Sequence, residues 1–208
     1  MPLLMKATRL TRAWLERTMT KPMSQASNLR LKVAARQLRE GKLLGYPTEA
    51  VWGLGCDPLN RQAVAELLAL KGRSAAKGLI LIAADFVQIE PFLDIDSVQM
   101  KNQLLASWPG PVTWIVPCAR TTPAWLQGNR GTLAVRVTGH PVAAALCRTF
   151  GGPIVSTSAN PSGAPPARTQ LKARCYFPGV RLHYLPGSTG GRKTPSAIID
   201  ARSGIKLR

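Results

Sequence analysis

The chain has 208 residues, of which 45% are hydrophobic, so it can bury one substantial core. Its 28 Lys and Arg against 10 Asp and Glu give a formal net charge of +18, which favours anionic partners such as nucleotides, RNA or lipid headgroups. No apolar stretch approaches the roughly 20 residues of a membrane span, so we expect a soluble, cytoplasmic protein without a membrane partner.

Residues 1–27 differ in composition from the rest, with five basic residues against one acid. A disordered basic tail, a transit peptide and a start codon assigned too far upstream would all have this composition. We treat residues 1–27 as a basic extension, expected to be disordered, and residues 28–208 as a single domain.

From residue 28 the hydrophobic pattern predicts helices and short strands in alternation. Asn28 and Asn60 can each cap a helix. The predicted elements are, in chain order, a helix from 28 to about 41, a strand at 43–46, a helix from 61 to about 71, a strand at 79–83, a helix at 98–108, strands at 112–116 and 132–137, a helix at 141–150, and strands at 153–156 and 197–200. This interleaving is typical of one mixed α/β sheet.

Two segments point to an anionic substrate. Lys71, Arg73 and Lys77 lie within seven residues, just before the predicted strand at 79–83. Taken alone, such a run is also typical of a solvated helix end. Residues 156–160 (STSAN) follow an apolar strand and offer hydroxyl and amide donors with little bulk, although a plain polar turn would have the same composition. Cations and small donors together are what a phosphate-bearing substrate requires.

Arg136 alternates with apolar residues in the predicted strand at 132–137. An arginine in so apolar a strand needs a partner, and no acid lies near it in the sequence. We therefore expect its guanidinium to bind a carboxylate or phosphate of the substrate.

Residues 187–194 (GSTGGRKT) invite comparison with a phosphate-binding P-loop, but Arg192 stands where that pattern requires Gly. An apolar run also follows, which predicts a strand instead of the required helix. The segment is either a surface turn or a flexible basic loop near the substrate, and residues 186–195 are our candidate lid.

Metal and nucleophilic chemistry have little support. The four cysteines form no Cys-x-x-Cys pair and only two histidines accompany them, so a zinc site is not expected. No carboxylate lies between Asp96 and Asp200, which excludes an Asp-rich metal cage from that half of the chain. A Gly-x-Ser-x-Gly elbow is also missing.

Together, these segments resemble the YrdC/TsaC family, the short-form threonylcarbamoyl-AMP synthases of tRNA modification. The segments that carry the resemblance are 46–57 (YPTEAVWGLGCD), 70–73 (LKGR), 77–81 (KGLIL), 108–113 (WPGPVT), 133–137 (LAVRV), 156–160 (STSAN) and 195–196 (PS). The resemblance runs from about residue 28 to the C-terminus. It implies a single α/β domain around a twisted, mixed and largely parallel sheet, with helices on both sides and a positively charged concave face.

The resemblance also implies an activity. The enzyme would be a nucleotidyltransferase that forms threonylcarbamoyl-AMP and pyrophosphate from L-threonine, bicarbonate or CO2, and ATP. Mg²⁺ would arrive on the nucleotide. A partner complex would then transfer the threonylcarbamoyl group to adenosine 37 of tRNAs that read codons starting with A, and the basic surface could contact RNA directly.

The same resemblance implies which residues form the site, with Lys71 and Arg73 in catalysis. The residues expected to contact the nucleotide are Lys71, Arg73, Lys77, Thr132, Ser158, Asn160, Arg168 and Arg208. Those expected to contact threonine are Thr48, Arg136 and Ser196. The longer family form has Thr in place of Ala50 and His in place of Ile82, so Thr48 or backbone groups would orient threonine here.

Two other functions fit the composition. One is a factor that binds double-stranded RNA or tRNA during maturation without catalysis, although no RNP-type or GXXG signature supports it. The other is an adenylating or carbamoylating enzyme that uses a different amino acid. Pyrophosphate release that requires threonine and bicarbonate together would separate the three.

Overall fold

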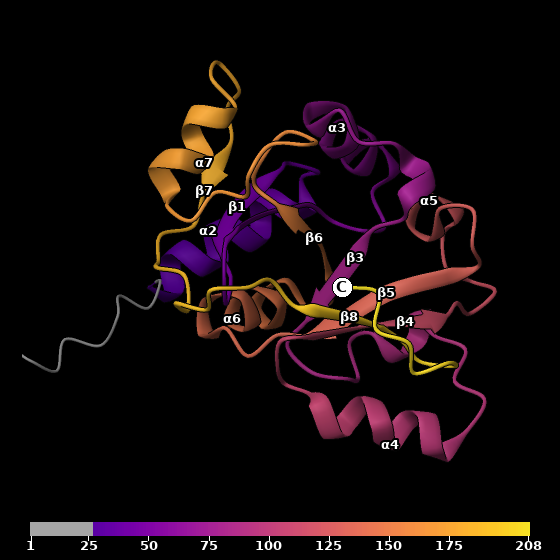
Figure 1. Ribbon diagram of the computed structural model, residues 1–208. Coiled ribbons are helices and arrows are strands. Elements are labelled where there is room, and N and C mark those ends of the chain that lie inside the picture. The colour runs from indigo at the N-terminus through magenta and orange to yellow at the C-terminus, as the bar shows by residue number, and fades with distance from the viewer. Residues whose placement is uncertain (1–26) are drawn as a thin grey trace, which may run out of the picture.

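The computed structural model describes residues 27–208, which contain one eight-stranded sheet (Figure 1). The strands are β1 (Leu44–Pro47), β2 (Trp52–Gly55), β3 (Ile80–Ala83), β4 (Val112–Pro117), β5 (Thr132–Val137), β6 (Ile154–Ser158), β7 (His183–Tyr184) and β8 (Ala197–Asp200). The helices are α2 (Asn28–Arg39), α3 (Arg61–Lys71), α4 (Val98–Ser107), α5 (Ala124–Gln127), α6 (Pro141–Phe150) and α7 (Gln170–Tyr176). The strand order is β7-β1-β2-β6-β3-β5-β4-β8.

The sheet is mixed. Three neighbouring pairs, β1–β7, β3–β5 and β4–β8, are parallel, and the other four are antiparallel. The α/β class is confirmed, but the expectation of a largely parallel sheet is corrected. Parallel neighbours need a crossover of a dozen or more residues, whereas the turn at residues 48–51 between β1 and β2 can only reverse the chain.

Helices cover both faces of the sheet, as expected. Along β3, Leu81 and Ala83 join the core cluster that contains residues of α3 and α4. Ile82 points the other way and joins the cluster built from α2 and α6, which lie side by side in Figure 1. Successive side chains of a strand alternate between faces, so Ile80 lies on the α2 and α6 face. These two helices leave part of that face uncovered.

Several local predictions are confirmed. The strand β5, the helix α6 and the strand β8 have the predicted bounds, and the Asn60 side chain accepts a hydrogen bond from the Ala63 N–H at 3.0 Å. The predicted cap at Asn28 is wrong, because Ser27 accepts from the Arg30 N–H and Asn28 is already helical. The strands β2 and β7 and the helices α5 and α7 were missed, because each is too short for a clear periodicity.

The glycine-rich motif at 52–57 has a packing reason. Gly55 lies in β2 where this strand approaches β6, and a Cβ at this position would lie 2.3 Å from the carbonyl oxygen of Val155. Only glycine therefore permits this approach of the two strands.

The predicted extension at 1–27 lies outside the described residues, apart from Ser27. Within residues 27–208, no helix has the length and apolar character of a membrane span.

Candidate functional site

A cavity of about 390 Å³ opens on the part of the sheet that α2 and α6 leave uncovered. Its floor is a row of register partners on four strands: Ser156, Ile80, Ala134 and Ile115. Register partners point to the same face, so all four side chains face the cavity. The volume lies in the range of small-molecule sites, roughly 300–1,000 Å³.

The lining is strongly cationic. Among residues 27–208, the cationic side chains of the cavity wall are Arg73, Lys77, Arg130, Arg136, Arg192 and Arg208. Glu49 is the one carboxylate in this part of the chain that lines the cavity with them. Six cations against one anion suit ligands that carry several negative charges.

Most of the predicted site residues meet in this cavity. Eight of the eleven line it: Thr48, Arg73, Lys77, Thr132, Arg136, Ser158, Ser196 and Arg208. Lys71, Asn160 and Arg168 do not line it. Ala50 also lines the wall, whereas Ile82 is fully buried in the core cluster with α2 and α6.

The strand register places two predicted nucleotide contacts, Thr132 and Ser158, away from the predicted threonine contact Arg136. Thr132 and Arg136 stand at opposite ends of β5, about 13 Å apart at the usual rise of roughly 3.3 Å per residue. Ser158 lies at the Thr132 end, because β6 runs antiparallel to β3 and β3 runs parallel to β5. The predicted nucleotide contacts Thr132 and Ser158 therefore share one end of the cavity, and Arg136 lies at the other.

Lys71 and Asn160 support the loop after β6. The Lys71 side chain is 4% exposed, and its ammonium donates to the backbone carbonyls of Ser158 and Asn160. Burial, and then the charge of Arg73, lowers the pKa of Lys71 to about 8, while the two carbonyls favour the ammonium form. The Asn160 amide donates to the carbonyls of Pro161 and Ala164 at 2.8 and 2.7 Å. Their predicted contacts with a nucleotide stay a prediction.

Arg73, two residues beyond Lys71, does reach the cavity. Gly72 caps α3 in the left-handed region at φ 58°, which turns the chain so that the two side chains diverge. Arg73 donates one hydrogen bond to the Gly78 carbonyl at 3.1 Å, and its buried Nε has no partner among residues 27–208. Burial lowers its pKa. A guanidinium with spare donors at a cavity wall is ready to bind an anion.

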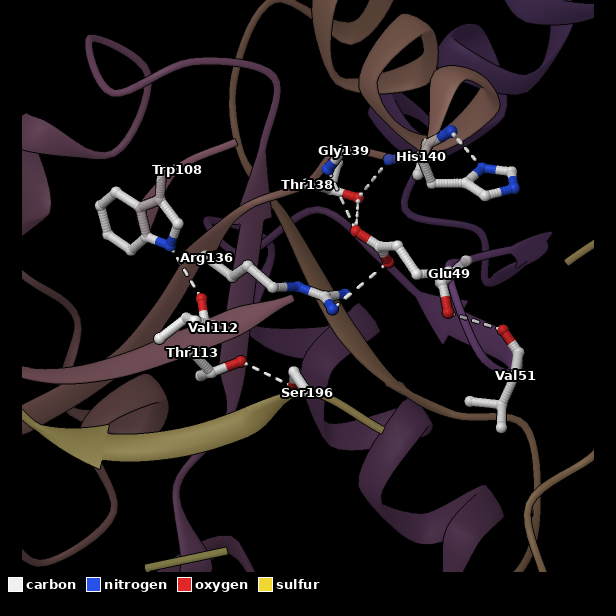
Figure 2. Close-up of polar contacts among 12 residues, drawn as sticks. Glu49, Val51, Trp108, Val112, Thr113, Arg136, Thr138, Gly139, His140 and Ser196 are labelled. Atoms are coloured by element: carbon white, nitrogen blue, oxygen red, sulfur yellow. Dashed lines mark hydrogen bonds and ion pairs between the residues drawn. The ribbon is translucent and has the colours of Figure 1, made fainter. Parts of the chain in front are cut away.

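Arg136 does have an acidic partner, contrary to the expectation from the sequence. Its Nη1 lies 3.3 Å from Oε2 of Glu49, and both side chains are nearly buried (Figure 2). Glu49 sits in the turn between β1 and β2, far from β5 in sequence. Its one sequence signal was its place inside the motif at 46–57.

A pair of hydroxyl groups lies near Arg136, one on the neighbouring strand β4 and one on the residue before β8. Oγ1 of Thr113 and Oγ of Ser196 are 2.9 Å apart and buried (Figure 2). The Arg208 guanidinium donates to the Ser196 carbonyl at 3.0 Å, so this predicted nucleotide contact lies beside a predicted threonine contact. Thr113 was missed as a site residue, although it belongs to the quoted motif at 108–113.

The candidate lid lies along the cavity edge. Its backbone N–H groups at Gly190 and Arg192 donate to the carbonyls of Thr48 and Glu49, both at 3.0 Å. Arg168 donates to the carbonyl of Lys193 in the same segment, at 2.7 Å. These contacts place Arg192 in the wall, while closure over a ligand stays a prediction.

Two of the thiols, the buried Cys56 and the partly buried Cys118, are poor nucleophiles. Burial raises the pKa of Cys56 and that of Cys118, the latter to about 11. Over residues 27–208, no three His, Cys, Asp or Glu side chains gather closely enough to hold a metal ion.

Sequence comparison agrees with the predicted resemblance. Residues 36–208 match the Sua5/YciO/YrdC family, which carries the description "Telomere recombination". The chain is 55% identical to a protein of Methylococcus capsulatus named threonylcarbamoyl-AMP synthase, over 89% of this chain and all of the relative. A protein of the same name from Halorhodospira halophila is also 55% identical, over 86% of this chain and 94% of the relative.

Solved structures of related proteins share the fold. The structure of P. abyssi Sua5 complexed with L-threonine has a TM-score of 0.76 and 33% sequence identity to this chain. The match covers 82% of this chain and 50% of the Sua5 chain. E. coli YciO has a TM-score of 0.72 with 23% identity, covering 82% of each chain. On the sequence match and the shared fold, this chain belongs to the Sua5/YciO/YrdC family.

Proposed function

We propose that the chain is a threonylcarbamoyl-AMP synthase, a nucleotidyltransferase that joins L-threonine, bicarbonate or CO2, and ATP into threonylcarbamoyl-AMP and pyrophosphate. The observation that carries the proposal is the meeting of eight predicted site residues in one cavity lined by six cations. Two relatives that are 55% identical bear the name of this synthase, and a Sua5 structure holds L-threonine.

The cavity suits the charges of these substrates. ATP, bicarbonate and the carboxylate of threonine are all anionic, so their approach to one another is opposed by repulsion in water. Arg73 and Lys77 would receive the triphosphate beside Ser158, and Arg136 would receive the carboxylate at the other end of β5. Catalysis would come from holding ATP and threonine next to each other in the reactive orientation and from neutralising the charge of the leaving pyrophosphate.

The chemistry requires no enzyme nucleophile. The threonine amine adds to CO2, which forms an N–C bond and releases a proton, and gives a carbamate. An oxygen of the carbamate then attacks the α-phosphorus of ATP, and the bond to pyrophosphate breaks. The raised pKa of Cys56 is compatible with this scheme, because a buried thiol would not compete. The segment at 186–195 would limit the access of water to the unstable carbamate.

Other partners follow from the same proposal. Mg²⁺ would travel on the triphosphate, because Glu49, the single carboxylate of the described cavity wall, already faces Arg136. The product would pass to a complex that modifies adenosine 37 of tRNA, in the cytoplasm. The excess of cations would also attract tRNA directly.

A product assay tests the proposal. The full chain is incubated with ATP and Mg²⁺, with and without threonine and bicarbonate, and pyrophosphate and the product mass are measured. We expect release only when both co-substrates are present, and much less with serine or glycine. Release without threonine would indicate a different ligase, and no release together with RNA binding would indicate a maturation factor. An Arg73→Gln variant should lose activity, whereas Arg202→Gln, on the exposed turn after β8, is the matched control.

A further inference from the structure

Glu49 is an unexpected residue in an anion-binding cavity. A carboxylate in the wall repels every anionic substrate, and Glu49 is only 9% exposed, so water screens it little. Burial by itself raises its pKa, but the charge of Arg136 and hydrogen bonds from Thr138 and Gly139 together lower it below the ordinary value. Glu49 is therefore a fixed negative charge, and its presence calls for a role.

The contacts of the carboxylate point to Arg136. Oε1 of Glu49 accepts from the Thr138 hydroxyl at 2.7 Å and from the Gly139 N–H at 3.0 Å, which immobilises the group (Figure 2). Oε2 is left facing Nη1 of Arg136 at 3.3 Å. Oε2 is shielded from solvent, so a ligand does not reach it without movement, whereas Arg136 itself lines the cavity.

The backbone of the same residue holds the candidate lid. The Glu49 carbonyl accepts from the Arg192 N–H at 3.0 Å, and the preceding carbonyl, of Thr48, accepts from Gly190 at the same distance. A Cβ on Gly190 would lie 3.0 Å from the Glu49 oxygen, so the lid rests directly on this backbone. One residue therefore contacts both the cationic group and the loop at this end of the cavity.

We propose that Glu49 is a positioning residue at the Arg136 end of the cavity, which we call the threonine end. Its carboxylate holds the Arg136 guanidinium ready for the threonine carboxylate, and its backbone keeps the candidate lid at 186–195 against the same end. This inference rests on the proposed function. The ion pair stabilises a buried guanidinium while the cavity is empty, and the donors of Arg136 that face the cavity stay free for the substrate.

Steady-state kinetics of Glu49→Gln test the role. Glutamine keeps the shape and an acceptor for Thr138 but removes the charge. We expect the KM for threonine to rise about tenfold, while the KM for ATP changes by less than about twofold. Glu90→Gln is the control, because Glu90 is an exposed glutamate paired with Lys101, and it should leave both values unchanged. Equal effects on the two substrates, or no effect on threonine, would overturn the proposal.

Two further variants keep the test decisive. Thr138→Val removes the hydroxyl that fixes Oε1 of Glu49 but retains the negative charge, so the KM for threonine should rise about threefold. If Glu49→Gln does not fold, the KM values of Thr138→Val test the positioning role in its place.

If Glu49 acts through Arg136, the double variant Glu49→Gln/Arg136→Gln should have no higher KM for threonine than Arg136→Gln alone. Additive losses would overturn the inference.

The wild-type assay distinguishes the two proposals. Normal synthesis in the wild type with an unaffected Glu49→Gln variant would refute the positioning role alone. No synthesis in the wild type would refute the proposed function, and the threonine-specific role with it.

Discussion

Replacing Lys71 by Met decides whether this lysine supports a loop or touches the substrate. Methionine keeps most of the apolar stem but removes the ammonium that the carbonyls of Ser158 and Asn160 share. The Ser158 carbonyl still accepts from the Asn160 N–H at 2.9 Å, so the buried Asn160 carbonyl is the one left unpaired. An unpaired buried acceptor costs about 1–3 kcal/mol, and the lost charge-assisted hydrogen bond to Ser158 adds to this cost. Part of this loss is offset, because a buried ammonium no longer has to be desolvated, as its lowered pKa of about 8 indicates.

The free energy of unfolding should therefore fall by about 2–3 kcal/mol. For a domain of this size about 1 kcal/mol corresponds to roughly 2–4 °C, so Tm should fall by about 4–12 °C in calorimetry. Arg73→Met is the matched control, because Arg73 makes a single side-chain hydrogen bond within residues 27–208, to Gly78, and faces the cavity. It should lower Tm by less than about 3 °C yet reduce pyrophosphate release by about 100-fold or more. A Lys71→Met protein with the wild-type Tm and no activity would refute the supporting role.

Three further predictions concern other parts of the molecule. Gly55→Ala should lower the free energy of unfolding by about 2 kcal/mol or more, because the new Cβ would lie 2.3 Å from the Val155 oxygen; an unchanged urea midpoint would contradict this. His140 caps α6, and its Nε2 lies 3.0 Å from the Ser188 carbonyl oxygen. Burial lowers the pKa of His140, so the folded state favours the neutral imidazole. This preference stabilises the fold at a pH above the unfolded pKa, and the stabilisation is lost as the pH falls through the folded pKa. The Tm of the wild type should therefore fall more steeply between about pH 7 and pH 5 than that of His140→Asn, and parallel curves would show that His140 does not carry the effect. Thr113→Val removes the 2.9 Å contact with Ser196 and should raise the KM for threonine about fivefold with little change for ATP, whereas equal changes would place the hydroxyl pair outside the threonine end.

Side-chain partners at the site could not be predicted from local sequence. Arg136 was expected to have no acidic partner, yet the turn between β1 and β2 brings Glu49 within 3.3 Å of it. Lys71 and Arg73 looked equivalent in one basic run, but Gly72 turns the chain between them, so that one supports a loop and the other lines the cavity.

Features that depend on near neighbours follow from the local sequence. Asn60 caps α3 through a bond three residues away, and the alternation at 132–137 and the apolar spacing at 141–150 produced β5 and α6 with the predicted bounds. The family could also be read from the order of its motifs. The parallel pairing of strands, the set of cations that face the cavity and the acid that balances Arg136 emerge only when the chain folds. The reason is that sheet register and loop closure bring together residues far apart in the chain, and no local pattern encodes which of them will meet.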